Sequence, residues 1–294
     1  MGAVIGAGLL FLVWFAAFHL GPLERVDQRV LRGFADLQHP HVNSIATSIA
    51  HLCDPKPYVY FAAVPLIVAL LRRRPRVAIA IVIILLGANL TTQLLKPLLA
   101  RPHTLFGGGV NVDRASWPSG HATAAMSLAL CSVLAAPPRL RPTVSALGAA
   151  FAIAVSYAFL TLGWHYPSDV LGGFLLALIW TLLIAAALYV AGDRWPPPPA
   201  ADARRPSVVE TLAPPAVVVA AGLLVVGLVA LARPHEVINY ARVHTTFVIG
   251  AAAIGTLAFA LATGLAVLAS SGRGETSGSV PAPTAAPRRR WRRG

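Results

Sequence analysis

The sequence is poor in cysteine, in lysine and in charge of either sign. Its 294 residues include two cysteines, Cys53 and Cys131, and two lysines, and only 12% of the residues are charged. Two cysteines exclude a disulfide framework and give no support to a cysteine-based metal site. Soluble domains carry about 25% charged residues, so the composition also excludes an ordinary soluble domain.

The sequence is rich in long runs of apolar residues. Hydrophobic residues make up 56% of the chain, with a mean hydropathy of +0.69. Several runs reach the roughly 18 residues that can cross a bilayer, which predicts an all-α, polytopic transmembrane helix bundle. The first run has no basic leader and no small-residue cleavage site, so we expect a retained helix. We predict eight spans, at about 2–20, 57–71, 77–95, 121–136, 144–164, 169–191, 214–232 and 246–270.

Composition also divides the chain along its length. The division that we predict is a six-helix unit over 1–191, a proline-rich linker over 192–213, a two-helix transmembrane appendage over 214–270 and a disordered basic tail over 271–294. The second span is short and can extend back into 44–52. Residues 22–38 alternate charged and apolar side chains at helical spacing, which indicates an amphipathic helix on the membrane surface or against the bundle.

The formal net charge of +13 would also fit a nucleic-acid-binding protein. Here the basic residues lie between the apolar runs, a pattern that orients membrane proteins and contacts anionic head groups. We therefore expect the lipid bilayer as partner and no nucleic acid. Fifteen basic residues fall on one side of the spans and nine on the other. This asymmetry predicts an integral plasma-membrane protein with both termini in the cytoplasm, and it places residues 96–120 and His165 outside.

A short polar stretch precedes the fourth span. Ser119, Gly120 and His121 lie together, and an apolar helical run follows directly. The N-terminus of a helix attracts anions through its free N–H groups and its dipole, and glycine permits close approach of a bound group. The stretch predicts an anion site, with phosphate as the expected anion. The alternative is that Ser119 only caps the helix.

A second polar stretch, Gly163 to Gly173, precedes the sixth span. His165 and Asp169 are four residues apart, and a helix that begins near Pro167 lets the carboxylate reach back to the imidazole. Such a carboxylate fixes the tautomer and leaves the other ring nitrogen as a nucleophile or base. Alternatively, Asp169 only favours the helix N-terminus through the dipole. Lys96, at the end of the third span, is either a membrane anchor or, with Arg101, a phosphate ligand.

The order Lys96, Arg101-Pro102, then Pro-Ser-Gly-His, then His-Tyr-Pro-Ser-Asp between membrane spans resembles the type 2 phosphatidic acid phosphatase (PAP2) superfamily. The resemblance covers roughly residues 22–190. It implies phosphoester hydrolysis without a metal or cofactor, through a phosphohistidine. By the family pattern His165 attacks phosphorus, Asp169 orients it and His121 protonates the leaving oxygen. Lys96, Ser119 and Gly120 would hold the phosphate oxygens.

Two arginines of the family pattern are absent from their places. The first motif puts Arg-Pro where this chain has His103 and Thr104, and the third puts Ser-Arg where it has Ala158 and Phe159. Each lost contact to a phosphate costs about 1.5–3 kcal/mol. Three residues could substitute: Arg101, His103 and Arg114. For Arg114, a pair with Asp113 or a solvated loop position is an equal alternative.

Two further chemistries have less support in the sequence. The triglycine at 107–109 lacks the Lys-Ser/Thr of a nucleotide-binding loop. His103, His121, His165 and Asp169 could form a zinc-like set, but no short metal-binding motif supports a metal. The remaining histidines, His51 among them, show no partner pattern and are expected at loops or interfaces.

The function expected from these features is a membrane phosphatase that acts on a lipid phosphate at the extracytoplasmic side. Polyprenyl phosphates or diphosphates and phosphatidate-type lipids are the expected substrates. One alternative is a lipid phosphotransferase that uses the same intermediate. Another, suggested by Phe159, is a non-hydrolytic lipid-binding membrane protein that retains the fold.

Overall fold

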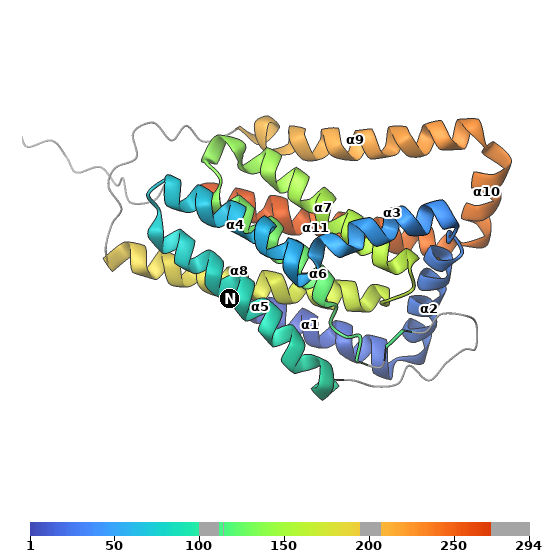
Figure 1. Cartoon of the computed structure of the whole chain (residues 1–294), viewed down its shortest axis with the longest axis horizontal. Coiled ribbons are helices and arrows are strands. Elements are labelled where there is room, and N and C mark those ends of the chain that lie inside the picture. Colours follow the sequence, from blue (N-terminus) through green and yellow to red (C-terminus); the bar gives the residue numbers. More distant parts are fainter. Residues whose placement is uncertain (100–111, 114, 195–206, 272–294) are drawn as a thin grey trace, which may run out of the picture.

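The computed structural model of the chain describes residues 1–99, 112–113, 115–194 and 207–271. Every regular element in these ranges is a helix, which confirms the predicted all-α fold. Most of the helices run along the long axis of the molecule, whereas α2 (Gly21–Ala35) and α10 (Pro234–Val243) cross one end of the bundle (Figure 1).

Six helices are long and apolar enough to cross a membrane. They are α1 (Gly2–His19), α5 (Pro75–Leu99), α7 (Arg141–Thr161), α8 (Pro167–Arg194), α9 (Val208–Ala232) and α11 (Thr245–Ser271). Each corresponds to a predicted span. The chain is therefore a polytopic membrane protein by the length and composition of its helices.

The second predicted span is a bent pair of helices. α3 (Pro40–Ala50) and the short 3₁₀ helix η1 (His51–Cys53) meet α4 (Pro55–Leu71) at an angle of 59°. The break falls at Asp54, whose backbone is extended. A residue that precedes proline disfavours helical geometry, so Pro55 explains why the chain bends here.

The fourth predicted span is α6 (Gly120–Ala135), which has 16 residues and lies at the centre of the bundle. Thirteen of these residues are buried, between α5, α7 and α8. Buried helix ends need partners for their free backbone groups. At the C-terminal end, Arg72 donates to the carbonyl of Ala135 (2.6 Å) and Arg74 to that of Leu134 (3.1 Å).

The two additional C-terminal spans differ in how they pack. α11 buries one face against α7 and α2, and the Tyr157 hydroxyl of α7 donates to the Ala251 carbonyl of α11 at 2.6 Å. α9 runs along the outside of the bundle and has no buried residue (Figure 1). Residues 195–206 of the predicted linker and 272–294 of the predicted tail lie outside the described residues, and the division into units stays a prediction.

The amphipathic helix expected over 22–38 is α2. It buries Val30, Leu31 and Phe34, and the Phe34 ring packs on Tyr157 at 5.2 Å between centroids. α10, which joins α9 to α11, was not anticipated from the sequence. Its Tyr240 hydroxyl donates to the Gly33 carbonyl of α2, so the two crossing helices contact each other.

Candidate functional site

The turn between α7 and α8 sets the position of His165. Gly163 follows the end of α7 with a φ of 73°, a left-handed conformation that glycine adopts without strain. The N–H of Gly163 bonds to the Leu160 carbonyl and that of Trp164 to the Phe159 carbonyl, both at 3.0 Å. These bonds close the end of α7 and turn the chain, so that His165 stands just before the first turn of α8.

His165 and Asp169 form the pair that their spacing predicts. The Nδ1 atom of His165 lies 3.2 Å from Oδ2 of Asp169, which also accepts the N–H of Tyr166 at 2.9 Å. The carboxylate is fully buried, and the imidazole side chain is 10% exposed. With Nδ1 donating to the carboxylate, Nε2 of His165 keeps its lone pair, which is the state a nucleophile or base requires.

A close contact between α8 and the start of α6 brings the two polar stretches together. The Ser119 N–H donates to the Asp169 carbonyl at 3.0 Å. A Cβ atom on Gly173 would lie 2.8 Å from the Ser119 carbonyl oxygen and 2.9 Å from the Thr123 nitrogen. Only glycine fits here, and its small size lets α8 approach the N-terminus of α6.

Ser119 is the N-cap of α6. Its hydroxyl accepts from the Ala122 N–H at 3.3 Å, and the residue is completely buried. Gly120 and His121 open the first turn, and the His121 side chain remains 26% exposed. The Ser119 hydroxyl therefore caps the helix in this structure, while the His121 side chain remains partly exposed.

The structure brings the two imidazoles, 44 positions apart in the sequence, to the same end of the bundle. The ring centroids of His121 and His165 lie 6.5 Å apart with the rings inclined at 62°. This separation leaves room for one phosphoryl group between a ring that attacks and a ring that gives a proton. The geometry can therefore support nucleophilic and acid catalysis on one phosphorus atom.

Of the other predicted phosphate ligands, the structure describes Lys96. Lys96 is half-buried near the end of α5 and close enough to interact electrostatically with His121. One turn before it, the Thr92 hydroxyl lies 3.1 Å from that of Thr123, which joins α5 to α6. Arg101, His103 and Arg114, the predicted substitutes for the missing arginines, lie outside the described residues.

Aromatic side chains form one wall of the site. Phe159, at the place where the family pattern has arginine, is fully buried, with its ring centroid 5.1 Å from that of His165 and 6.0 Å from that of His121. Trp164 packs against His121 at 6.2 Å. The site thus has an apolar wall where a cation was expected from the resemblance.

Two carboxylates near the site were not singled out from the sequence. Asp54, at the bend before α4, contacts His121 and His51, and Asp27 of α2 contacts Ser168. His51, for which the sequence shows no partner pattern, has its Nδ1 atom 2.5 Å from Oδ2 of Asp54. The spacing of three residues between His51 and Asp54, next to Pro55, is the sequence signal that could have indicated this pair.

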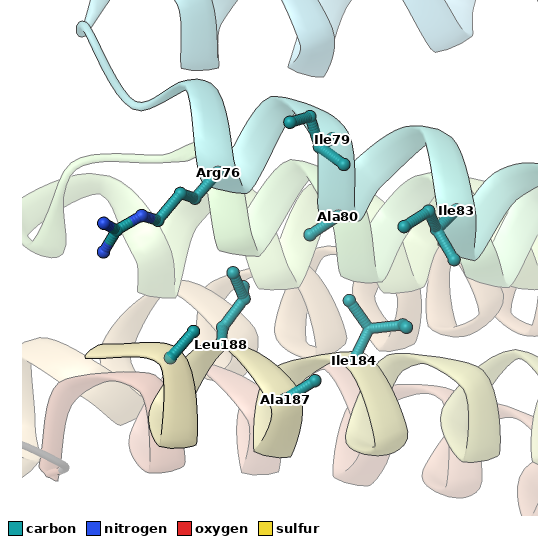
Figure 2. Close-up of a pocket in the computed structure, with 8 residues that line it drawn as sticks. Arg76, Ile79, Ala80, Ile83, Ile184, Ala187 and Leu188 are labelled. Atoms are coloured by element: carbon teal, nitrogen blue, oxygen red, sulfur yellow. The ribbon is translucent and has the colours of Figure 1, made fainter. Parts of the chain in front are cut away.

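A group of metal ligands or a separate cavity would give the described structure a further binding site. Within the described ranges, no three His, Cys, Asp or Glu side chains are arranged to hold a metal ion. An apolar cavity of about 500 Å³ lies between α5 and α8, lined by Arg76, Ile79, Ile83, Ile184 and Leu188 (Figure 2). These residues belong to the beginning of α5 and the end of α8, so the cavity lies at the other end of the bundle from Lys96 and Asp169.

The fold and the site define a polytopic helical membrane protein with two histidines and one buried aspartate gathered at one end of its bundle. Residues 76–193 match the model of the PAP2 superfamily. This segment contains all three of these residues, and over it the chain is similar to members of that superfamily.

Two proteins from Bacillus subtilis are similar to this chain. Phosphatidylglycerophosphatase B of strain 168 is 25% identical over 187 residues, which cover 60% of this chain and 90% of the relative. The crystal structure described as the first transmembrane PAP2-type phosphatidylglycerolphosphate phosphatase matches with a TM-score of 0.53 and 21% identity. That match covers 63% of this chain and 95% of the other. The structural likeness bears on the fold.

Proposed function

We propose that this chain is a membrane phosphatase that hydrolyses a lipid phosphate through a phosphohistidine at His165. The observation that carries the proposal is the pair of imidazoles 6.5 Å apart, with His165 bonded through Nδ1 to the buried Asp169. The relationship to a phosphatidylglycerophosphatase supports a phosphate ester as substrate. The position of the site at the end of an apolar helix bundle favours a lipid, either a polyprenyl phosphate or diphosphate or a phosphatidate-type lipid.

In the proposed reaction, Nε2 of His165 attacks phosphorus while Asp169 holds the ring in the reactive tautomer. His121 gives its proton to the leaving oxygen, and water then hydrolyses the P–N bond. In this proposal Lys96 and the N-terminus of α6, with Ser119 and Gly120, stabilise the negative oxygens. No step uses a metal ion.

The orientation of the chain is part of the same proposal. Arg72 and Arg74 lie at the turn between α4 and α5 and Arg76 in the first turn of α5, whereas the histidines lie near the other end of α5. By the positive-inside rule the arginine-rich end is cytoplasmic and the site is extracytoplasmic. In intact cells, a membrane-impermeant maleimide should label Glu236→Cys, on exposed α10, and should fail to label Arg73→Cys. The reverse labelling would overturn this orientation.

The decisive experiment compares wild type with His165→Ala. Purified proteins receive a panel of lipid phosphates in the presence of EDTA, and released phosphate is measured. We expect activity in the wild type and a loss of about 10³-fold or more in the variant, the scale of loss known for removal of a catalytic nucleophile. Equal activity in the two proteins would refute the assignment to this site. Loss of wild-type activity in EDTA would refute the metal-independent mechanism.

Phe159 favours a second candidate function, transfer of the phosphoryl group to an alcohol. Its ring covers one side of His165 and reduces the access of water from that side. Product analysis with an added acceptor alcohol separates the two reactions. A larger amount of phosphorylated acceptor than of free phosphate would identify a transferase, and free phosphate alone would identify a hydrolase.

A further inference from the structure

Asp54 joins two histidines at the partly exposed edge of the site. Its Oδ1 atom lies 3.2 Å from Nε2 of His121, and its Oδ2 atom lies 2.5 Å from Nδ1 of His51. Asp54 is not one of the residues that carry the resemblance to the PAP2 pattern. Its contact with His121 is therefore a feature of this chain that has no role in the proposed reaction as described above.

Helix packing fixes the position of Asp54. The residue is the N-cap of α4 and lies at the 59° bend that separates this helix from η1. α4 packs directly on α6, and the Tyr58 hydroxyl, one turn after Asp54, donates to the Ala124 carbonyl at 3.3 Å. The contact between Asp54 and His121 is thus part of the interface between two packed helices.

We propose that Asp54 is a positioning residue that orients His121 and stabilises its protonated form, so that His121 can act as the acid. The inference rests on the proposed function. It gives the site two histidine–carboxylate pairs with opposite tasks. Asp169 prepares the His165 ring to attack, and Asp54 prepares the His121 ring to give a proton.

The contact determines which nitrogen of His121 transfers the proton. In this proposal Nε2–H donates to Asp54, and Nδ1–H remains to give its proton to the leaving oxygen. As the P–O bond breaks, its electron pair stays on the lipid oxygen, which takes the proton from Nδ1 and leaves His121 neutral. In the second step water attacks phosphorus, the P–N bond to His165 breaks, and Nδ1 takes a proton from that water. Asp54 keeps its contact with Nε2 throughout, and His121 ends each cycle protonated.

Other charged groups face this pair from three elements. His51 of η1 shares the Asp54 carboxylate. Lys96 of α5 and His165, which precedes α8, act electrostatically on His121. Burial of the His121 ring is the largest effect and opposes its protonation, and Lys96 acts in the same direction. The hydrogen bond and the negative charge of Asp54 favour protonation. The Asp54 side chain is 39% exposed, so water weakens its effect and we expect a moderate contribution to the rate.

The test uses leaving groups that differ in their need for an acid. Dioctanoyl phosphatidate releases a poorly stabilised alkoxide, whereas 4-nitrophenyl phosphate releases a stable phenolate. For Asp54→Asn we expect kcat/KM on the phosphatidate to fall by roughly tenfold or more, a part of the ~10²-fold or larger effect of general acid catalysis. On 4-nitrophenyl phosphate, kcat/KM should change by less than about twofold, because that step needs little acid assistance.

Matched variants complete the experiment. His121→Ala should show the same selective loss as Asp54→Asn, but larger. His51→Gln, which removes the outer partner and keeps Asp54, should leave kcat/KM on both substrates within about threefold of wild type. His165→Ala should lose both activities, and a fully active His165→Ala protein would instead refute the proposed function itself.

The pH profile gives a second readout that a purely structural role would not produce. In wild type, the alkaline limb of kcat/KM on the phosphatidate reports loss of the proton from the acid. Asp54→Asn should move this limb to lower pH, and Asp54→Glu should restore it in part. Equal losses on the two substrates with an unmoved limb would overturn the proposal.

Discussion

The side chain of Asp27, on α2, binds the first turn of α8 through both of its oxygens. Oδ1 accepts the Ser168 N–H at 2.9 Å and Oδ2 accepts the Ser168 hydroxyl at 2.6 Å. Ser168 directly precedes Asp169, so the amphipathic helix caps the helix that carries the site. Loss of water around the carboxyl group raises the pKa of Asp27 to about 7, even though the two hydrogen bonds from Ser168 act in the other direction.

This pKa predicts how stability changes with pH. The pKa is higher in the folded chain than the ordinary value of 3.8, so the folded state binds more protons between about pH 4 and pH 7. Stability should therefore fall as pH rises through this window, by up to about 4 kcal/mol from this group. Asp27→Asn keeps an oxygen for the Ser168 N–H and resembles the protonated form. Thermal unfolding in detergent should show equal Tm values at pH 4.5 and a higher Tm for Asp27→Asn at pH 8.

The control is Asp27→Ala, which removes both hydrogen bonds to Ser168. We expect a lower Tm than that of Asp27→Asn at every pH, by an amount that corresponds to about 1–3 kcal/mol. If wild type and Asp27→Asn lost stability in parallel between pH 4.5 and pH 8, the carboxyl group would not be the source of the pH dependence.

A second prediction concerns Asp169. Asp169→Asn should lower kcat by roughly 10²-fold or more, because the neutral amide stabilises a positively charged His165 ring less than the carboxylate does, and an NH₂ group turned toward Nδ1 selects the wrong tautomer. The side chain is nearly the same size, so Tm should change by only a few degrees. Phosphate release and Tm are measured on one preparation. A variant with wild-type kcat would show that His165 needs no orienting carboxylate.

The sequence predicted the local parts of the site and missed the distant ones. His165 and Asp169 are one helical turn apart, and Ser119 and His121 share the start of one helix, so spacing alone placed each set. The Asp54–His121 contact joins residues 67 positions apart, and the Asp27–Ser168 contact joins residues 141 positions apart. Both depend on how helices pack, which the spacing of residues within one segment does not encode.

The same distinction holds for the fold. Long apolar runs predicted the membrane helices to within a few residues of their ends. α10 could not be predicted in this way because its ten residues contain polar and apolar side chains in equal numbers and no long apolar run. The burial of one face of α11 against α7 and α2 also had no local signal, since a helix that faces lipid and a helix that faces protein are equally apolar.

A third prediction tests the close approach of α8 to α6. Gly173→Ala would place a Cβ within 2.9 Å of backbone atoms of Ser119 and Thr123, so α8 must move away and carry Asp169 with it. We expect at least a tenfold loss of kcat/KM, the scale of effect for a misplacement of about 1 Å at a catalytic site, together with a lower Tm. Gly222→Ala, on the exposed face of α9, meets no atom within 4 Å and serves as the matched control. Equal activity of both variants would show that the contact at Gly173 does not position the site.

The last prediction concerns the phenyl ring at position 159. Phe159 is fully buried against His165 and His121, so Phe159→Arg places a cation beside the two imidazoles. Without an anion this buried charge should lower Tm. With phosphate or vanadate bound, one charge-assisted contact contributes about 1.5–3 kcal/mol, so product inhibition by phosphate should tighten by roughly tenfold to a hundredfold. Phe159→Leu provides the control, because it alters packing without adding charge, and it should leave the inhibition constant within about threefold of wild type. A folded Phe159→Arg protein with unchanged phosphate inhibition would mean that position 159 does not face the bound oxyanion.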